Sequence, residues 1–156
     1  RPDRLVLEIT ESLLLRDDHG VWRDLRNLRR TGVRVAIDDF GTGYSALSYL
    51  REVPLDAIKL DRSFTRSMTT SRQQRELVRG IVGLASVLGL DVIAEGIQTE
   101  QERDIATAIG CHYGQGYLFS RPLPEENLRR WLAAATRGHR NRTGSAARAT
   151  ATVHRM

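Results

Sequence analysis

The sequence predicts an α/β fold of about five strand–helix units, arranged as part of a (β/α)₈ barrel of the TIM type. Short β-rich apolar runs alternate with helical periods, and a polar side chain stands at or just after the end of each run. Strands that alternate with helices pair in parallel, which fits either an open doubly wound sheet or a barrel. A whole barrel needs roughly 250 residues, so 156 residues suffice for about five of its eight units.

The first half of the chain supplies three of the expected strands. Between the first two, apolar residues recur at a spacing near 3.6 over residues 21–28, which indicates a helix that ends at Thr31-Gly32. The second strand leads into the motif Asp-Asp-Phe-Gly-Thr-Gly at 38–43, and a short helix is expected over 46–50. The three strands are the β-rich runs at residues 5–10, 33–37 and 57–61.

The second half supplies two more strands and three helices. Thr99 and Glu102 have the spacing of a capping box for a helix that Gly110 closes, and Pro124 opens the last helix. A longer helix is expected over residues 73–88. Its single apolar stripe consists of Leu77, Ile81, Leu84 and Leu88. The two strands are the runs at residues 92–96 and 115–119.

Length and charge indicate one domain over residues 1–136 and an Arg-rich tail over residues 137–156. The tail holds five of the 24 basic residues and no acid, which leaves 19 bases against 19 acids in the domain. The tail has no apolar periodicity, so we expect disorder there and no DNA partner. The single cysteine excludes an internal disulfide, and no apolar run reaches the length of a membrane span. We therefore expect a cytoplasmic protein with no membrane contact from this chain.

Lys59 is the only lysine, and the other 23 basic residues are arginines. The chain uses arginine for general positive charge, so a single lysine indicates a position that needs a compact ammonium group. A lysine retained by chance is the alternative explanation.

Charged or amide side chains stand at the carboxyl ends of all five expected strands. Parallel strands bring these ends to one rim, where α/β folds carry their active sites. Carboxylates gathered there need a counter-charge that one lysine cannot supply and divalent cations can. Oxygen donors without a His or Cys cluster favour Mg²⁺ or Mn²⁺ over Zn²⁺. The residues are Glu8 with Glu11, Asp38 with Asp39, Lys59 with Asp61, Glu95, and Gln115.

The adjacent pair Asp38-Asp39 suits a site for two metal ions. If the strand breaks there, one carboxylate can bridge two ions while its neighbour holds one. Two ions roughly 3.5–4 Å apart form a clamp for in-line attack on phosphate esters. Taken alone, such a pair is more often a solvated turn, and the Gly41-Thr42-Gly43 that follows is too short for a dinucleotide-binding fingerprint.

Five motifs together identify a family resemblance over residues 1–136. They are LEITES at 7–12, DDFGTGYS at 38–45, IKLDRSF at 58–64, AEGI at 94–97 and GQGYLF at 114–119. In this order and spacing they resemble an EAL domain. The resemblance implies hydrolysis of cyclic di-GMP to linear pGpG on a modified (β/α)₈ barrel with two Mg²⁺ or Mn²⁺ ions.

The resemblance also implies roles for individual residues. Lys59 matches a lysine placed against the nucleophilic water and the phosphate, and Gln115 matches an amide that supports the water and the metals. Glu11 matches the glutamate that holds the loop after Asp-Asp, and Arg62 is either a phosphate contact or a surface pair. The implied metal ligands are Glu8, Asp38, Asp39 and Glu95. The implied catalytic residues are Lys59, Glu95 and Gln115, and Asp39 is also placed at the substrate.

The chain departs from the family pattern in two ways. The tripeptide Glu-Ala-Leu and a metal-binding Asn are absent and would lie N-terminal to Arg1, so activity is expected of the complete domain and little of this part alone. Gln98 stands where the family usually has a glutamate.

Two other functions stay open. One is a catalytically inactive EAL domain that serves as a cyclic di-GMP receptor or protein-interaction module. The other is an enolase-like barrel with Lys59 as the proton-abstracting base, which the motif at 38–43 disfavours. By analogy, a homodimer and an upstream GGDEF or sensor domain are expected.

Overall fold

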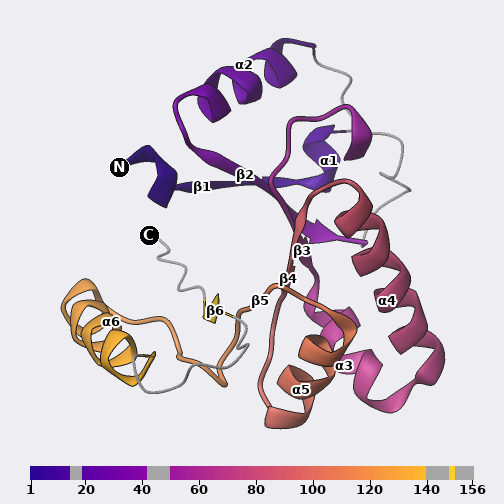
Figure 1. Ribbon diagram of the computed structural model, residues 1–156, viewed down its shortest axis with the longest axis vertical. Coiled ribbons are helices and arrows are strands. Elements are labelled where there is room, and N and C mark those ends of the chain that lie inside the picture. The colour runs from indigo at the N-terminus through magenta and orange to yellow at the C-terminus, as the bar shows by residue number, and fades with distance from the viewer. Residues whose placement is uncertain (15–18, 42–49, 140–147, 150–156) are drawn as a thin grey trace.

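The computed structural model describes residues 1–14, 19–41, 50–139 and 148–149, in which strands and helices alternate along the chain (Figure 1). Within these residues, six parallel strands form one sheet. The strands are β1 (Val6–Thr10), β2 (Arg34–Phe40), β3 (Ala57–Leu60), β4 (Asp91–Ala94), β5 (Tyr113–Gly114) and β6 (Arg148–Ala149). The helices are η1 (Pro2–Arg4), α1 (Glu11–Leu14), α2 (His19–Arg30), α3 (Arg62–Thr70), α4 (Arg72–Val87), α5 (Glu100–Ile109) and α6 (Glu125–His139).

The order of the strands distinguishes between the two α/β arrangements considered above. A doubly wound sheet reverses its strand order at a switch point, whereas barrel strands follow one another in a single direction. Here each strand pairs with the next one along the chain. Helices α2, α4, α3 and α5 lie on the outer side of the strands (Figure 1). This is the arrangement of consecutive units of a (β/α)₈ barrel.

The two faces of the sheet bury different side chains because successive side chains of a strand alternate. The face toward the helices carries the main core, whose most buried strand residues are Val35, Ile37, Ile58, Leu60 and Val92. The inner face carries a smaller apolar layer of Ala36, Ala57, Ile93 and Tyr113. Residues 38, 59 and 95 lie two positions beyond members of this layer. They therefore point to the inner face at the carboxyl end of the sheet.

An ion pair lies at the opposite, amino end of the inner face. Arg34 Nη2 lies 2.5 Å from Asp91 Oδ2 where β2 and β4 begin. The hydrogen bond to Asp91 raises the pKa of Arg34 against the effect of burial, and Tyr113 contributes in the same direction. The apolar layer thus separates this pair from the charged residues at the carboxyl end.

Helix α5 confirms the predicted capping box. The Glu102 backbone N–H donates to Thr99 Oγ1 at 3.2 Å, and the Thr99 N–H donates to Glu102 Oε2 at 2.9 Å. Gly110 ends the helix in the left-handed conformation. The capping motif fixes where the chain leaves the loop after β4.

The predicted fifth strand at residues 115–119 is wrong, because β5 consists of Tyr113 and Gly114. Beyond Gly114 the backbone turns around Ile97 and leaves the strand direction. The Ile97 N–H donates to the Gln115 carbonyl at 3.0 Å, and the Leu118 N–H donates to the Ile97 carbonyl at 3.0 Å. A Cβ on Gly116 would lie 2.1 Å from the Ile97 oxygen, so this close approach needs glycine.

The predicted apolar stripe of α4 is wrong at two of its four positions, because Ile81 and Leu88 pack against the main core but Leu77 and Leu84 do not. The buried residues of α4 are Val78, Val82 and Ala85, whereas Leu77 is 49% exposed and Leu84 is 37% exposed. Valine and alanine let the helix pack closely against β4 and α5, which hydrophobicity alone does not reveal.

Residues 38–40 and 62–70 differ from the elements expected of them. Helix α3 was not predicted, and β2 runs on through residues 38–40. The helix expected over 46–50 lies outside the described residues except for its last position, as does most of the expected tail. In the part of the chain that is described, no helix has both the length and the apolar character needed to cross a membrane.

Cys111 is expected to be unreactive in the folded protein. It is buried in the main core, and burial raises its thiol pKa to about 11. The nucleophilic thiolate is therefore scarce at neutral pH. A thiol-specific chromogenic reagent at pH 7.5 should modify Cys111 only after denaturant is added. Complete modification of the native protein within minutes would contradict this prediction.

Candidate metal and catalytic centre

A β-bulge at Asp38-Asp39 brings two consecutive carboxylates to one side of the sheet. The pairing of β2 with β3 advances from Ile37↔Ile58 to Phe40↔Leu60, so β2 gains one extra residue. Asp39 has φ 54°, a left-handed conformation uncommon for a residue other than glycine. In a regular strand the two side chains would point to opposite faces. The bulge removes that alternation and redirects Asp39.

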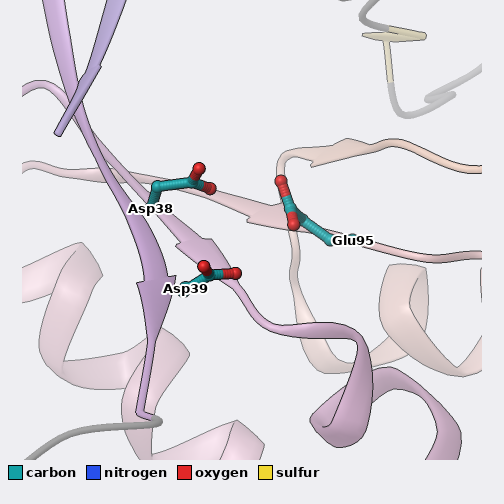
Figure 2. A group of neighbouring side chains, drawn as sticks. All are labelled: Asp38, Asp39 and Glu95. Atoms are coloured by element: carbon teal, nitrogen blue, oxygen red, sulfur yellow. The ribbon is translucent and has the colours of Figure 1, made fainter. Parts of the chain in front are cut away.

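Three carboxylates form a group that fits a metal ion. Oxygen atoms of Asp38, Asp39 and Glu95 all lie within 4.8 Å of one another. Figure 2 shows the three side chains converging, two from β2 and one from the residue after β4. Oxygen-only donors suit hard divalent cations such as Mg²⁺ and Mn²⁺.

Lys59 contacts two carboxylates of this group, Asp38 and Glu95, and also the carboxylate of Glu8. Its Nζ lies 2.7 Å from Asp38 Oδ1, 2.8 Å from Glu8 Oε2 and 2.5 Å from Glu95 Oε1. The lysine side chain is only 4% exposed. Burial opposes its charge, but hydrogen bonds to the carboxylates, that of Asp38 first, raise its pKa above the usual value. Lys59 is therefore a buried cation at the centre of an excess of negative charge.

Glu95 is a largely buried carboxylate whose charge Lys59 offsets only in part. Burial raises the pKa of Glu95, and the hydrogen bond and charge of Lys59 only partly offset that effect. Its Oε1 atom is buried and lies 2.5 Å from Lys59 Nζ. Because one lysine faces several carboxylates, a divalent cation would supply the additional positive charge that this buried group lacks.

The other site residues expected from the sequence lie around this group. Glu8 joins it through Lys59 and is not one of the three clustered carboxylates. Glu11 is buried, and its Oε2 accepts the Gly41 N–H at 3.2 Å. The Gln115 N–H donates to the Ala94 carbonyl, next to Glu95. Arg62 is exposed at the start of α3.

Asp61 has a local role, because its side chain caps α3 by accepting the Ser63 N–H at 2.9 Å. The first turn of α3 was missed by sequence reasoning. The available signal was Asp61 directly before the polar helical run of residues 62–70.

Comparisons with known proteins all relate the chain to EAL domains. The EAL domain family model matches residues 1–122. The cyclic di-GMP phosphodiesterase PA2567 of Pseudomonas aeruginosa is 48% identical over 128 residues, which are 82% of this chain and 22% of that protein. The chain therefore spans about a fifth of the length of this curated relative.

Solved structures show the same similarity in three dimensions. The PaMucR phosphodiesterase in complex with c-di-GMP matches with a TM-score of 0.75 and 41% identity, over 81% of this chain and 51% of that one. The Klebsiella pneumoniae BlrP1 manganese/cy-diGMP complex matches with a TM-score of 0.72 and 37% identity, over 78% of this chain and 31% of that one. The predicted fold, about five units of a longer barrel, is confirmed.

Proposed function

The chain belongs to the EAL domain family, and from that premise we propose that the complete domain containing it hydrolyses cyclic di-GMP to linear pGpG. The observation that carries the proposal is the cluster of Asp38, Asp39 and Glu95, two of which, Asp38 and Glu95, also pair with the buried Lys59. The relatives named as cyclic di-GMP phosphodiesterases and the solved complexes with the dinucleotide support the choice of substrate.

The metal site of this proposal holds two Mg²⁺ or Mn²⁺ ions. Asp38, Asp39 and Glu95 would hold the ions, and Glu8 and residues outside this chain would complete the site. Divalent ions in such a site lower the pKa of bound water and stabilise charge that develops on a phosphate. The manganese complex of a relative supports the choice of metal.

The chain's own residues supply the remaining chemistry. Lys59 places a positive charge where negative charge grows on the phosphate oxygens during attack. Gln115 orients the attacking water, Glu11 holds the loop after Asp39 through the Gly41 N–H, and Arg62 contacts the substrate phosphate. The oxygen of one water bonds to phosphorus as one P–O ester bond breaks, and the proton that the water loses ends on the leaving ribose oxygen, which becomes a hydroxyl. The cyclic dinucleotide thereby opens to the linear one.

The same proposal places the domain in the cytoplasm of a bacterium as part of a second-messenger system. A homodimer and an upstream GGDEF or sensor domain are its proposed partners. We propose that the domain spans residues 1–136 and that the Arg-rich residues 137–156 follow it.

The full-length protein with Mg²⁺ or Mn²⁺ should convert cyclic di-GMP to pGpG, and EDTA should abolish the conversion. Chromatography of the nucleotides measures both. Tight binding of cyclic di-GMP without turnover under all metal conditions would contradict the proposal and favour a receptor. The isolated 156-residue chain is expected to have little activity under the same conditions.

A further inference from the structure

The first turn of α3 lies against both loops that carry the clustered carboxylates. Asp61 caps the helix, and the next three residues follow the end of β3, the strand that also carries Lys59. The turn contacts Gly41, two residues after Asp39, and Gly96, directly after Glu95. The turn therefore contacts the backbone next to carboxylates from two different strands.

The contact with Gly41 is made by Phe64. A Cβ on Gly41 would lie 2.5 Å from Cε2 and 2.6 Å from Cζ of the Phe64 ring. That is far inside the distance at which carbon atoms normally pack. On the other side, the Gly41 N–H donates to Glu11 Oε2. The loop after Asp39 is thus held between a buried carboxylate and an aromatic ring.

The contact with Gly96 is made by Arg62. A Cβ on Gly96 would lie 2.5 Å from Arg62 Cβ and 3.4 Å from Arg62 Cα. Both atoms belong to the rigid start of the side chain, so rotation of the guanidinium arm cannot relieve the clash. The backbone that carries Glu95 therefore rests directly on α3.

We propose that Arg62 and Phe64 are positioning residues: the first turn of α3 sets the separation between Asp38-Asp39 and Glu95, and with it the affinity of the site for divalent cations. This inference rests on the proposed metal site. It requires no polar contact from Arg62 to the metals or the substrate. A shift of either loop moves a ligand of the cluster, because each contact lies one or two residues from a carboxylate.

The chain contains a matched control for each contact. Gly89 has φ +70° against +69° for Gly96, and no heavy atom lies within 4 Å of a Cβ built there. Gly32 has φ +96° against +94° for Gly41, and its nearest atoms lie at an ordinary 3.7 Å. Alanine at both members of a pair therefore meets the same unfavourable φ, and only one member also clashes with α3.

The test measures Mn²⁺ binding by the full-length protein, using the electron paramagnetic resonance signal of free Mn²⁺ in the absence of nucleotide. Unfolding temperatures in EDTA report the structural cost. Gly96→Ala and Gly41→Ala should raise the Mn²⁺ Kd by about tenfold or more, as loss of outer-shell support does. Gly89→Ala and Gly32→Ala should lower the unfolding temperature but leave the Kd unchanged.

A second variant identifies the contact itself. Arg62→Gly removes the Cβ that a methyl group added at position 96 would meet, so Mn²⁺ affinity should recover in the Gly96→Ala/Arg62→Gly protein. Arg62→Ala keeps that Cβ and should not restore affinity. If Gly96→Ala and Gly89→Ala give equal Kd values, the inference is overturned.

Two remaining outcomes are also decisive. If the alanine variants at Gly41 and Gly96 fail to fold, Phe64→Leu, which lacks the ring atoms against Gly41, should still raise the Kd, and an unchanged Kd overturns the inference. A wild-type protein that binds no Mn²⁺ would instead refute the proposed metal site on which the inference rests.

Discussion

Replacement of Lys59 by methionine should reduce kcat for cyclic di-GMP hydrolysis by about 10³-fold, the upper range for removal of one charge-stabilising donor. The methionine fills a similar volume but lacks the ammonium group that now lies within 2.8 Å of Glu8, Asp38 and Glu95. No other lysine is available to take its place, since Lys59 is the only one in the chain. Steady-state formation of pGpG, measured by chromatography, gives the kcat of each protein and so the ratio of the wild-type kcat to that of Lys59→Met.

The same variant should be less stable than the wild type, and the size of this difference should depend on whether metal is bound. Without metal, Lys59→Met leaves three neighbouring carboxylates without their buried counter-charge, and the free energy of unfolding should fall by about 3–5 kcal/mol. Saturating Mn²⁺ should recover most of that loss, because the ions replace the missing positive charge. Lys59→Arg is the control: it keeps the charge but not the compact shape, so it should retain more stability than activity. Wild-type kcat in Lys59→Met would remove Lys59 from the proposed mechanism.

The sequence was sufficient to predict the elements that meet at the site. The ends of parallel strands share one rim, so residues such as Asp38, Lys59 and Glu95 could be expected together although they are far apart in the chain. Five short β-rich runs with helices between them also indicated the parallel sheet, and its sequential strand order followed the barrel pattern. These features depend on local periodicity and on chain topology, both of which a single sequence records.

The features that the sequence did not reveal depend on close contacts between segments that are far apart in the chain. The bulge at Asp39 and the contact of Phe64 with Gly41 are set by neighbouring strands and helices. Helix α3 was missed although the sequence contains two signals for it, the cap at Asp61 and the helical spacing of Phe64 and Met68. The end of β5 was misplaced because Gly116 packs against Ile97, a contact between segments that the local pattern does not contain.

The Glu95→Gln substitution should separate metal binding from folding. Gln has the shape of Glu but is a poor ligand for hard cations, so Mn²⁺ affinity should fall by at least about tenfold. Because several kcal/mol of transition-state stabilisation depend on the ions, kcat should fall by about 10²–10³-fold. Binding is measured with free Mn²⁺, and turnover as pGpG formed. Glu126→Gln, an exposed position on α6, should change neither.

The same substitution should stabilise the metal-free protein at neutral pH. Burial raises the pKa of Glu95 above its ordinary value of 4.5, so the fold favours the protonated form. The stability contributed by that proton is complete below pH 4.5 and is lost as the pH rises through the raised pKa. Gln cannot lose a proton and should keep this contribution. In EDTA, the unfolding free energy of Glu95→Gln should exceed that of the wild type near pH 7, and the gap should close on acidification. A gap that widened toward acid would mean that Glu95 is stabilised as a carboxylate, with Lys59 outweighing burial.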